Sequence, residues 1–252
     1  MNDVSVTFER ITDIGAKSPT LVEGLPGYGL VAAIAVDQIT DQLGLEHHGS
    51  IVSDEFPPVL SYHEGRARDM VRVYASPEQN VMTLQSDLAL PPSAFEPLSR
   101  CVHEDLADEF ERAIFIAGAP AESEEALGTV QAVATTDELE ASVRDAGIDL
   151  VEGTGLVGGV TGTLANDCYR NDVPAVVLIV HADPYLPDPG AARSVIEGAL
   201  EPLVDFDVDT TELKEQAEQI QRQMRQIAEQ YQRMIEGAQT EQQPETPTGM
   251  YQ

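Results

Sequence analysis

The chain has 252 residues, of which 42% are hydrophobic, so it is long enough for one large domain with a buried core and further appendages. It carries 44 Asp and Glu residues against 14 Lys and Arg residues, which gives a formal net charge of −30. Because so much negative charge repels phosphate groups, nucleic acids and anionic membranes are excluded as expected partners.

Short apolar runs alternate with helical patterns along most of the chain. The pattern predicts strands at residues 19–24, 48–56, 70–76, 81–87, 112–120 and 173–183, helices at residues 30–44, 93–110, 137–147 and 188–203, and a strand, a glycine-rich loop and a helix within residues 149–172. The run "PAVVLIV" is apolar throughout, as expected for a strand covered on both faces. Strands that alternate with helices predict an α/β fold of three layers around a largely parallel central sheet.

A helix of a different kind follows this α/β domain, which we expect to span residues 1–210. Within residues 211–236, apolar side chains recur at alternating intervals of four and three residues: Leu213, Ala217, Ile220, Met224, Ile227, Tyr231 and Met234. This heptad seam is typical of a coiled coil, in which the helix pairs with another helix or a partner chain. A helix that packs on its own domain is the alternative.

The last segment, residues 237–252, contains too little apolar surface to offset the entropy cost of ordering it, so the sequence predicts a flexible tail. Yet the tail ends in Met250, Tyr251 and Gln252. An apolar side chain and an aromatic ring at a free end indicate a tail that another protein holds.

Two glycine-rich turns are candidate ligand loops. The stretch "GLPGYG" joins a predicted strand to a predicted helix, so backbone amides near Gly24, Gly27 and Gly29 could hold a phosphate. It lacks the Lys of a P-loop and the spacing of the dinucleotide motif, and a tight strand-to-helix turn explains the same glycines. The second turn, residues 153–162, also fits close packing of a helix or a neighbouring subunit against the backbone.

Residues capable of catalysis are present only as isolated side chains. The five His residues show no metal-ligand spacing, and no nucleophile elbow accompanies His181 and Asp183 at the end of a predicted strand. We therefore expect no catalytic residues, no metal and no cofactor.

Several features indicate a cytoplasmic protein. Cys101 and Cys168 lie far apart, as expected of two reduced thiols. The N-terminal residues do not resemble a signal peptide, and the longest apolar run is too short to cross a bilayer. Acid spread along the whole chain with only two Lys residues is typical of a salt-loving cytoplasm, where molar salt screens self-repulsion.

Four motifs carry a resemblance to a known family: a G-x-P-G-x-G turn (residues 24–29), an E-F-P-P stretch (55–58), a G-x-x-G-G-x-x-G loop (155–162) and a P-D-P-x-A-A turn (187–192). With them, residues 4–215 resemble the proteasome assembly chaperone 2 family in its archaeal and actinobacterial form. The resemblance implies a nucleoside-phosphorylase-like α/β fold that assembles into homo-oligomers or paired complexes.

Some archaeal members of that family carry a hydrophobic–Tyr–any tail that binds the α-ring of the core proteasome. Met250 matches the hydrophobic position, Tyr251 the tyrosine and Gln252 the terminal residue. The resemblance thus implies a non-enzymatic, ATP-independent chaperone or activator that docks on the α-ring through its tail. Two alternatives remain: a small-ligand-binding or nucleoside-processing α/β enzyme that uses the glycine-rich turns, and a scaffold whose tail is incidental.

Overall fold

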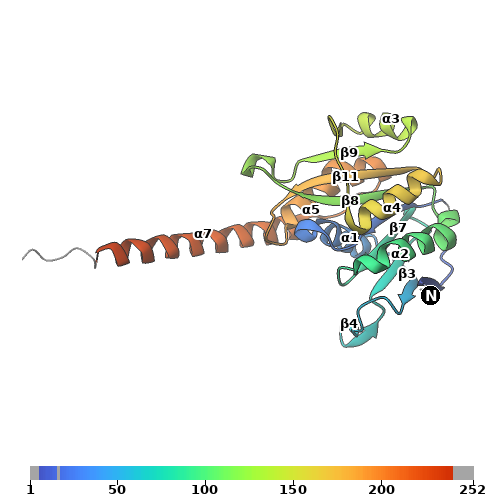
Figure 1. Cartoon of the computed structure of the whole chain (residues 1–252), viewed down its shortest axis with the longest axis horizontal. Helices are drawn as coiled ribbons and strands as arrows, with labels where there is room; N and C mark the ends of the chain where they lie inside the picture. Colours follow the sequence, from blue (N-terminus) through green and yellow to red (C-terminus); the bar gives the residue numbers. More distant parts are fainter. Residues whose placement is uncertain (1–5, 16–17, 241–252) are drawn as a thin grey trace, which may run out of the picture.

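A central sheet with helices on both faces forms the body of the protein, and one long helix projects from it (Figure 1). The structure is a computed structural model that describes residues 6–15 and 18–240. Helices α1 (Val31–Gln42) and α5 (Pro189–Val195) pack on one face, and α2 (Phe95–Cys101) and α4 (Gly159–Arg170) pack on the other. The arrangement has the three layers that the sequence predicts.

The central sheet is mixed, with a parallel centre. Among the described residues it has nine strands, which lie in the order β1 (Val6–Arg10), β3 (Glu46–Ser53), β6 (Val71–Ala75), β7 (Val81–Ser86), β2 (Thr20–Gly24), β8 (Arg112–Pro120), β11 (Ala175–Ala182), β9 (Val130–Ala134) and β10 (Asp149–Leu150). The four central strands β7, β2, β8 and β11 are mutually parallel. On one side β1, β3, β6 and β7 pair antiparallel, and on the other β9 runs antiparallel to β11. The prediction of a largely parallel sheet therefore describes the centre, while the flanks add antiparallel pairs.

The central strands are buried on both faces, which explains their continuous apolar runs. Along β8, Ala113 and Phe115 face one core cluster, whereas Ile114 and Ile116 face the other. The same alternation continues along β11, where every second side chain points to the opposite layer. The predicted strand pair at residues 70–76 and 81–87 is confirmed as the antiparallel pair of β6 and β7.

Two strands that were not expected pair outside this sheet. They are β4 (Ser61–His63) and β5 (Arg66–Arg68), which form an antiparallel hairpin of their own. The hairpin stands away from the body, on the side of β3 (Figure 1). Strands β1 and β9 were also missed.

The helices begin and end close to the expected residues. Thr136 caps α3 (Asp137–Asp145), and Asp188 caps α5, each by accepting a hydrogen bond from a backbone amide in the first turn. The helix expected at residues 188–203 is interrupted, since a π-helical turn (Ile196–Leu200) separates α5 from α6 (Glu201–Val204). None of the helices in the described ranges is long and apolar enough to cross a membrane.

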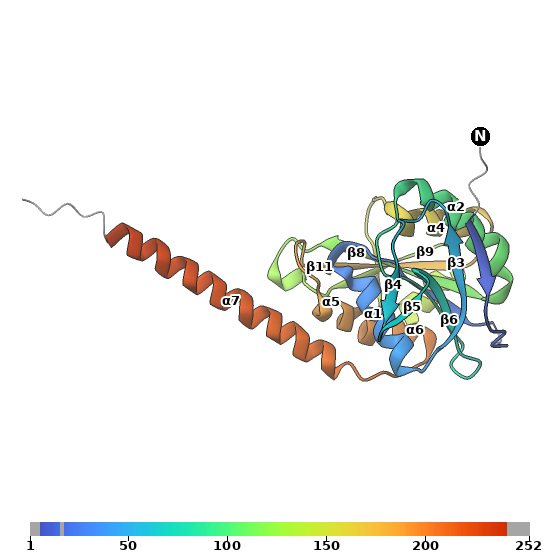
Figure 2. The same cartoon turned by 90° about the horizontal axis from the view of Figure 1, so that it is seen from below.

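The C-terminal helix α7 spans Thr211–Thr240 and continues past the end expected at residue 236. Leu213 is only 3% exposed, and Ala217 and Ile220 are half-buried beside α5. Met224, the next seam residue, is 47% exposed. Packing on its own domain thus holds for the first turns, and beyond them the helix leaves the body (Figure 2). Its pairing with another chain stays a prediction.

Candidate functional site

The glycine-rich turn at the end of β2 brings helix α1 against the sheet. A Cβ on Gly24 would lie 2.5 Å from the Cβ of Val36, so only glycine lets α1 pack this closely. Gly29 has a φ of 61°, and Leu30 follows with a φ of 51°, a backbone conformation that costs energy for a non-glycine residue. The turn interpretation therefore accounts for Gly24 and Gly29.

The same turn separates two cavities at the carboxyl edge of the parallel strands, where ligands bind in many α/β proteins. The first, which we call the arginine cavity, has a volume of about 530 Å³ and is lined by Gly24, Pro26, Leu30, Ala33, Ile34, Asp37, Arg68, Arg72, Gln85, Ser86, Asp87, Leu88 and Ala89. The second, which we call the glycine cavity, has a volume of about 310 Å³ and lies between the Gly27 side of the turn and residues 156–161. Pro26 and Ala89 line both cavities.

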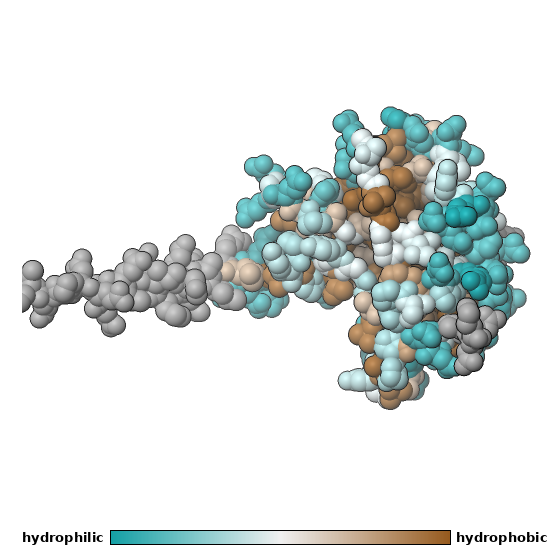
Figure 3. Space-filling model, in the orientation of Figure 1, coloured by the Kyte–Doolittle hydropathy of each residue, from teal (hydrophilic) through white to brown (hydrophobic). Residues whose placement is uncertain are grey.

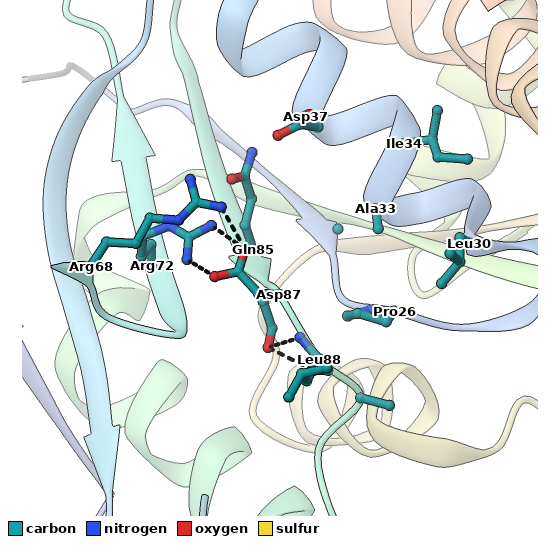
Figure 4. Close-up of a pocket in the computed structure, with 13 residues that line it drawn as sticks. Pro26, Leu30, Ala33, Ile34, Asp37, Arg68, Arg72, Gln85, Asp87 and Leu88 are labelled. Carbon is teal, nitrogen blue, oxygen red and sulfur yellow. Dashed lines mark hydrogen bonds and ion pairs between the residues drawn. The ribbon is translucent and has the colours of Figure 1, made fainter. Parts of the chain in front are cut away.

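A network around Asp87 forms the charged wall of the arginine cavity (Figure 4). Arg72 Nη1 lies 2.7 Å from Asp87 Oδ2, and Arg68 Nη2 lies 2.7 Å from Asp87 Oδ1. The Ser61 hydroxyl also donates to Asp87, and Arg72 Nε donates to the Tyr74 hydroxyl. Burial alone would raise the pKa of Asp87, but the hydrogen bonds from Arg72 and Ser61 outweigh it and lower that pKa. Asp87 is therefore ionised at neutral pH and ties the hairpin to the sheet.

Asp37 of α1 lines the same cavity, across from the arginines (Figure 4). Burial, together with the nearby carboxylate of Asp41, raises the pKa of Asp37. Leu30, Ile34 and other apolar side chains form the remaining wall. A cavity of this kind suits a small molecule with an apolar body and a polar end. Among the described residues, those that line this cavity include neither His nor Cys.

A buried carboxyl group lies under the glycine-rich turn and was missed from the sequence. Glu23 is fully buried, and burial raises the pKa of Glu23 to about 8, although the Leu25 amide and Thr161 hydroxyl favour its ionised form. The Leu25 amide donates to Glu23 Oε1 at 3.0 Å, and Thr161 Oγ1 lies 3.4 Å from both carboxylate oxygens. At neutral pH the group is therefore mostly protonated. The sequence signal for it was an acid within the strand "TLVEG", whose other four residues are all buried.

Asp183, which was weighed for catalysis, closes a turn, and the two Cys residues are buried. Asp183 Oδ1 accepts hydrogen bonds from the amides of Tyr185 and Leu186, so it closes a turn after β11. Cys101 and Cys168 are free, and burial raises the pKa of each thiol to about 12. Within residues 6–15 and 18–240, no group of His, Cys, Asp and Glu could hold a metal ion.

The predicted partner-binding residues Met250, Tyr251 and Gln252 lie outside the described residues. Of the seam, the side chains of Leu213, Ala217, Ile220 and Met224 are described, and those of Ile227, Tyr231 and Met234 are not. The structure therefore describes the side chains of the first four seam residues, and the roles of the seam and of the tail stay predictions.

Known proteins are similar to this chain over most of its length. The PAC2 family profile matches residues 21–228. An uncharacterized protein of Methanocaldococcus jannaschii is 26% identical over 233 residues, which are 92% of this chain and 94% of that protein.

Two solved structures from Pyrococcus furiosus share the fold. PbaA, an archaeal homolog of proteasome-assembly chaperone, matches with a TM-score of 0.79 at 24% identity over 94% of this chain and 97% of its own. PbaB, an archaeal proteasome activator, matches with a TM-score of 0.79 at 17% identity over 89% of this chain and 99% of its own. With the fold, the turn motifs and the family profile in agreement over most of its length, the chain belongs to the PAC2 family.

Proposed function

We propose that this protein is a non-enzymatic, ATP-independent proteasome-binding chaperone or activator, which docks on the α-ring of the core proteasome through its C-terminal residues. Membership of the PAC2 family supports a proteasome-related role. Similarity to the P. furiosus assembly-chaperone homolog and proteasome activator points in the same direction.

The observation that carries the proposal is the course of α7. Its root is fixed beside α5, and the rest of its 30 residues leaves the body. At 1.5 Å per residue, the helix is about 45 Å long. Such an arm places Thr240, the last described residue, away from the domain, and this supports a docking role for the residues that follow.

Docking uses the chemistry of the last three residues. Met250 and the ring of Tyr251 fill an apolar crevice between neighbouring α-subunits, and the Gln252 carboxylate meets a Lys there. One tail offers two side chains and one charge, so it binds weakly. Several copies on one assembly raise the effective concentration of tails and give a useful avidity.

Co-sedimentation with purified core proteasome in molar KCl tests the proposal. Tyr251→Ala and deletion of residues 250–252 should each abolish binding, because the anchor is lost. Thr248→Ala, a change two residues before Met250, is the matched control and should bind as the wild type does. If both tail variants co-sediment like the wild type, tail docking is wrong.

The alternative, a small-ligand-binding or nucleoside-processing enzyme, draws support from the arginine cavity at the carboxyl edge of the sheet. Thermal-shift measurements with nucleosides, with and without inorganic phosphate, test it. A shift that Asp37→Asn and Arg68→Ala both remove favours the alternative. No shift with any of these probes counts against it.

A further inference from the structure

We infer that the arginine cavity binds a small zwitterion with an apolar body, whose ammonium group pairs with Asp37 and whose carboxylate pairs with Arg68. An apolar α-amino acid and a short apolar peptide both have this chemistry. The inference goes beyond the proposed function, because binding at this cavity involves neither the tail nor a reaction.

Asp37 supplies the anionic wall of the cavity. It lines the cavity, and in Figure 4 no hydrogen bond or ion pair joins it to the other lining residues. Burial and the neighbouring Asp41 raise the pKa of Asp37, and the charges of Arg68 and Arg72 oppose this shift only in part. A cation bound beside Asp37 completes the compensation of its charge.

The opposite wall retains a positive charge, because two guanidinium groups share the single carboxylate of Asp87. Both Nη atoms of Arg72 donate to Asp87, and the Arg72 side chain is 2% exposed. The Arg68 side chain is 29% exposed and reaches Asp87 through Nη2 alone, and no described residue accepts a hydrogen bond from its Nη1. Arg68 therefore keeps N–H donors for the carboxylate of a ligand.

The Gln85 amide lies between these two charged walls (Figure 4), although Gln85 is only 7% exposed. Its nitrogen donates to Thr40 Oγ1 at 2.6 Å and to the Val36 carbonyl at 3.3 Å. Because the Thr40 hydroxyl donates to the same Val36 carbonyl, it accepts from Gln85 and fixes the orientation of the amide. The carbonyl oxygen of Gln85 is left as an acceptor at the cavity, where it suits a second N–H of an ammonium group.

The remaining wall is apolar and partly open to solvent. It consists of Pro26, Leu30, Ala33, Ile34, Leu88 and Ala89. Leu30 is 40% exposed and Leu88 is 43% exposed. Figure 3 shows further apolar surface where the β4–β5 hairpin, which bears Arg68, stands out from the body. The strained backbone of Leu30, with its φ of 51°, holds that side chain at the rim. A ligand with an apolar body removes this surface from water.

The charges of the two walls select the ligand. A ligand with a single charge of either sign leaves one wall uncompensated, and a neutral nucleoside compensates neither. A zwitterion meets Asp37 and Arg68 at once. The cavity volume of about 530 Å³ lies within the range of about 300–1,000 Å³ that is typical of small-molecule sites.

Isothermal titration calorimetry of the full chain in molar KCl tests the inference. The probes are leucine, leucyl-leucine, N-acetyl-leucine and leucinamide. Leucine or leucyl-leucine should bind, and the tighter of the two identifies the ligand as an amino acid or a peptide. N-acetyl-leucine lacks the ammonium group and leucinamide lacks the carboxylate, so each should bind more weakly than leucine by about tenfold or more.

Variants of the lining test the assignment of the walls. Asp37→Asn removes the anionic wall and Arg68→Ala removes the free donors, so each should weaken binding of the zwitterion by about tenfold or more. Arg66→Ala, on the same strand as Arg68 but outside the cavity lining, is the matched control and should bind as the wild type does. Ala33→Leu fills the cavity from α1 without changing a charge and should also weaken binding by about tenfold or more.

Failure of both leucine and leucyl-leucine to bind the wild type would overturn the inference. So would wild-type affinity in Asp37→Asn, or equal binding of leucine and either blocked probe. A thermal shift with a nucleoside and none with leucine would overturn it in favour of the enzyme alternative. The lining variants keep residues 250–252, so they should co-sediment with core proteasome as the wild type does, and a failure at the cavity is distinguishable from a failure of tail docking.

Discussion

Arg72 and Asp87 form a two-pronged ion pair, with Arg72 Nη1 2.7 Å from Asp87 Oδ2 and Arg72 Nη2 2.9 Å from Asp87 Oδ1. The Arg72 side chain is 2% exposed, so its charge has little contact with water. Planar pairing of this type satisfies a buried guanidinium in both geometry and charge. The pair joins β6 to the end of β7 and fixes one wall of the arginine cavity.

Asp87→Asn should therefore lower the free energy of unfolding by about 3 kcal/mol, because it leaves the buried Arg72 charge without its counterion. Guanidinium denaturation in molar KCl measures the change. Asp54→Asn, at an exposed position, removes the same charge and should stay within about 0.5 kcal/mol of the wild type. Equal stability of the two variants would show that the pair adds nothing.

Glu23 predicts a dependence of stability on pH. Its pKa is raised from 4.5 to about 8 on folding, so between these values the folded state binds a proton that the unfolded state lacks. The contribution of Glu23 to the free energy of unfolding is therefore largest below pH 4.5 and is lost as the pH rises through about 8.

Glu23→Gln should remove that loss and raise the stability at pH 8.5, because the amide stays uncharged at every pH. Denaturation curves at pH 5.5, 7 and 8.5 measure it. An unchanged pH profile in the variant would mean that another group controls the dependence.

Gly118 allows the turn after β2 to lie on β8. A Cβ at this position would sit 2.3 Å from the carbonyl oxygen of Tyr28, a backbone atom that cannot move alone. Gly118→Ala should cost about 2 kcal/mol of stability by displacing the turn. Gly198→Ala, where a Cβ meets no heavy atom within 4 Å, should be neutral or slightly stabilising. Thermal unfolding of both variants compares them.

The root of α7 and its projecting part should respond differently to truncation. Leu213→Ala should lower the free energy of unfolding by about 2–4 kcal/mol, because Leu213 is 3% exposed in the core. Met224→Ala should change it by less than about 0.5 kcal/mol, because Met224 is 47% exposed. Chemical denaturation at low protein concentration measures both, and a large loss with Met224→Ala would place that side chain in the domain core.

In the tail, the aromatic ring should matter more than the terminal charge. Molar salt screens the contact between the Gln252 carboxylate and a Lys, whereas burial of Met250 and Tyr251 persists. One extra Gly after Gln252 displaces the carboxylate and should weaken proteasome binding in molar KCl less than Tyr251→Ala does. Binding isotherms on immobilised core particle compare the two. The reverse order would make the charge the main anchor.

The strands and helices predicted best are those that neighbouring residues in the sequence specify, without reference to distant strands. The apolar run of β11, the turn between β6 and β7 and the capped helix α3 each carry a complete local signal. β1 and β9 were missed because their burial alternates weakly, and their pairing partners are distant in sequence. The antiparallel position of β9 beside β11 depends on how the chain crosses the sheet, which no local pattern encodes.

The candidate site was predicted only in part. The glycine-rich turn was placed correctly at the end of a strand, since its glycines and its flanking apolar runs are local. Arg72, Asp87 and Asp37 come from three separate elements, and only the folded sheet brings them to one cavity. Glu23 looks like an ordinary strand acid until its burial is known.

The length of α7 sets how far its C-terminal end lies from the body. In the proposed docking, a helix that is fixed at its root and extends for about 45 Å sets the distance between the body and the surface that residues 250–252 bind. Inserting seven residues after Met224 increases that distance by about 10 Å and keeps the apolar seam nearly in phase. Inserting two residues changes the distance by only about 3 Å but turns everything beyond by roughly 200°.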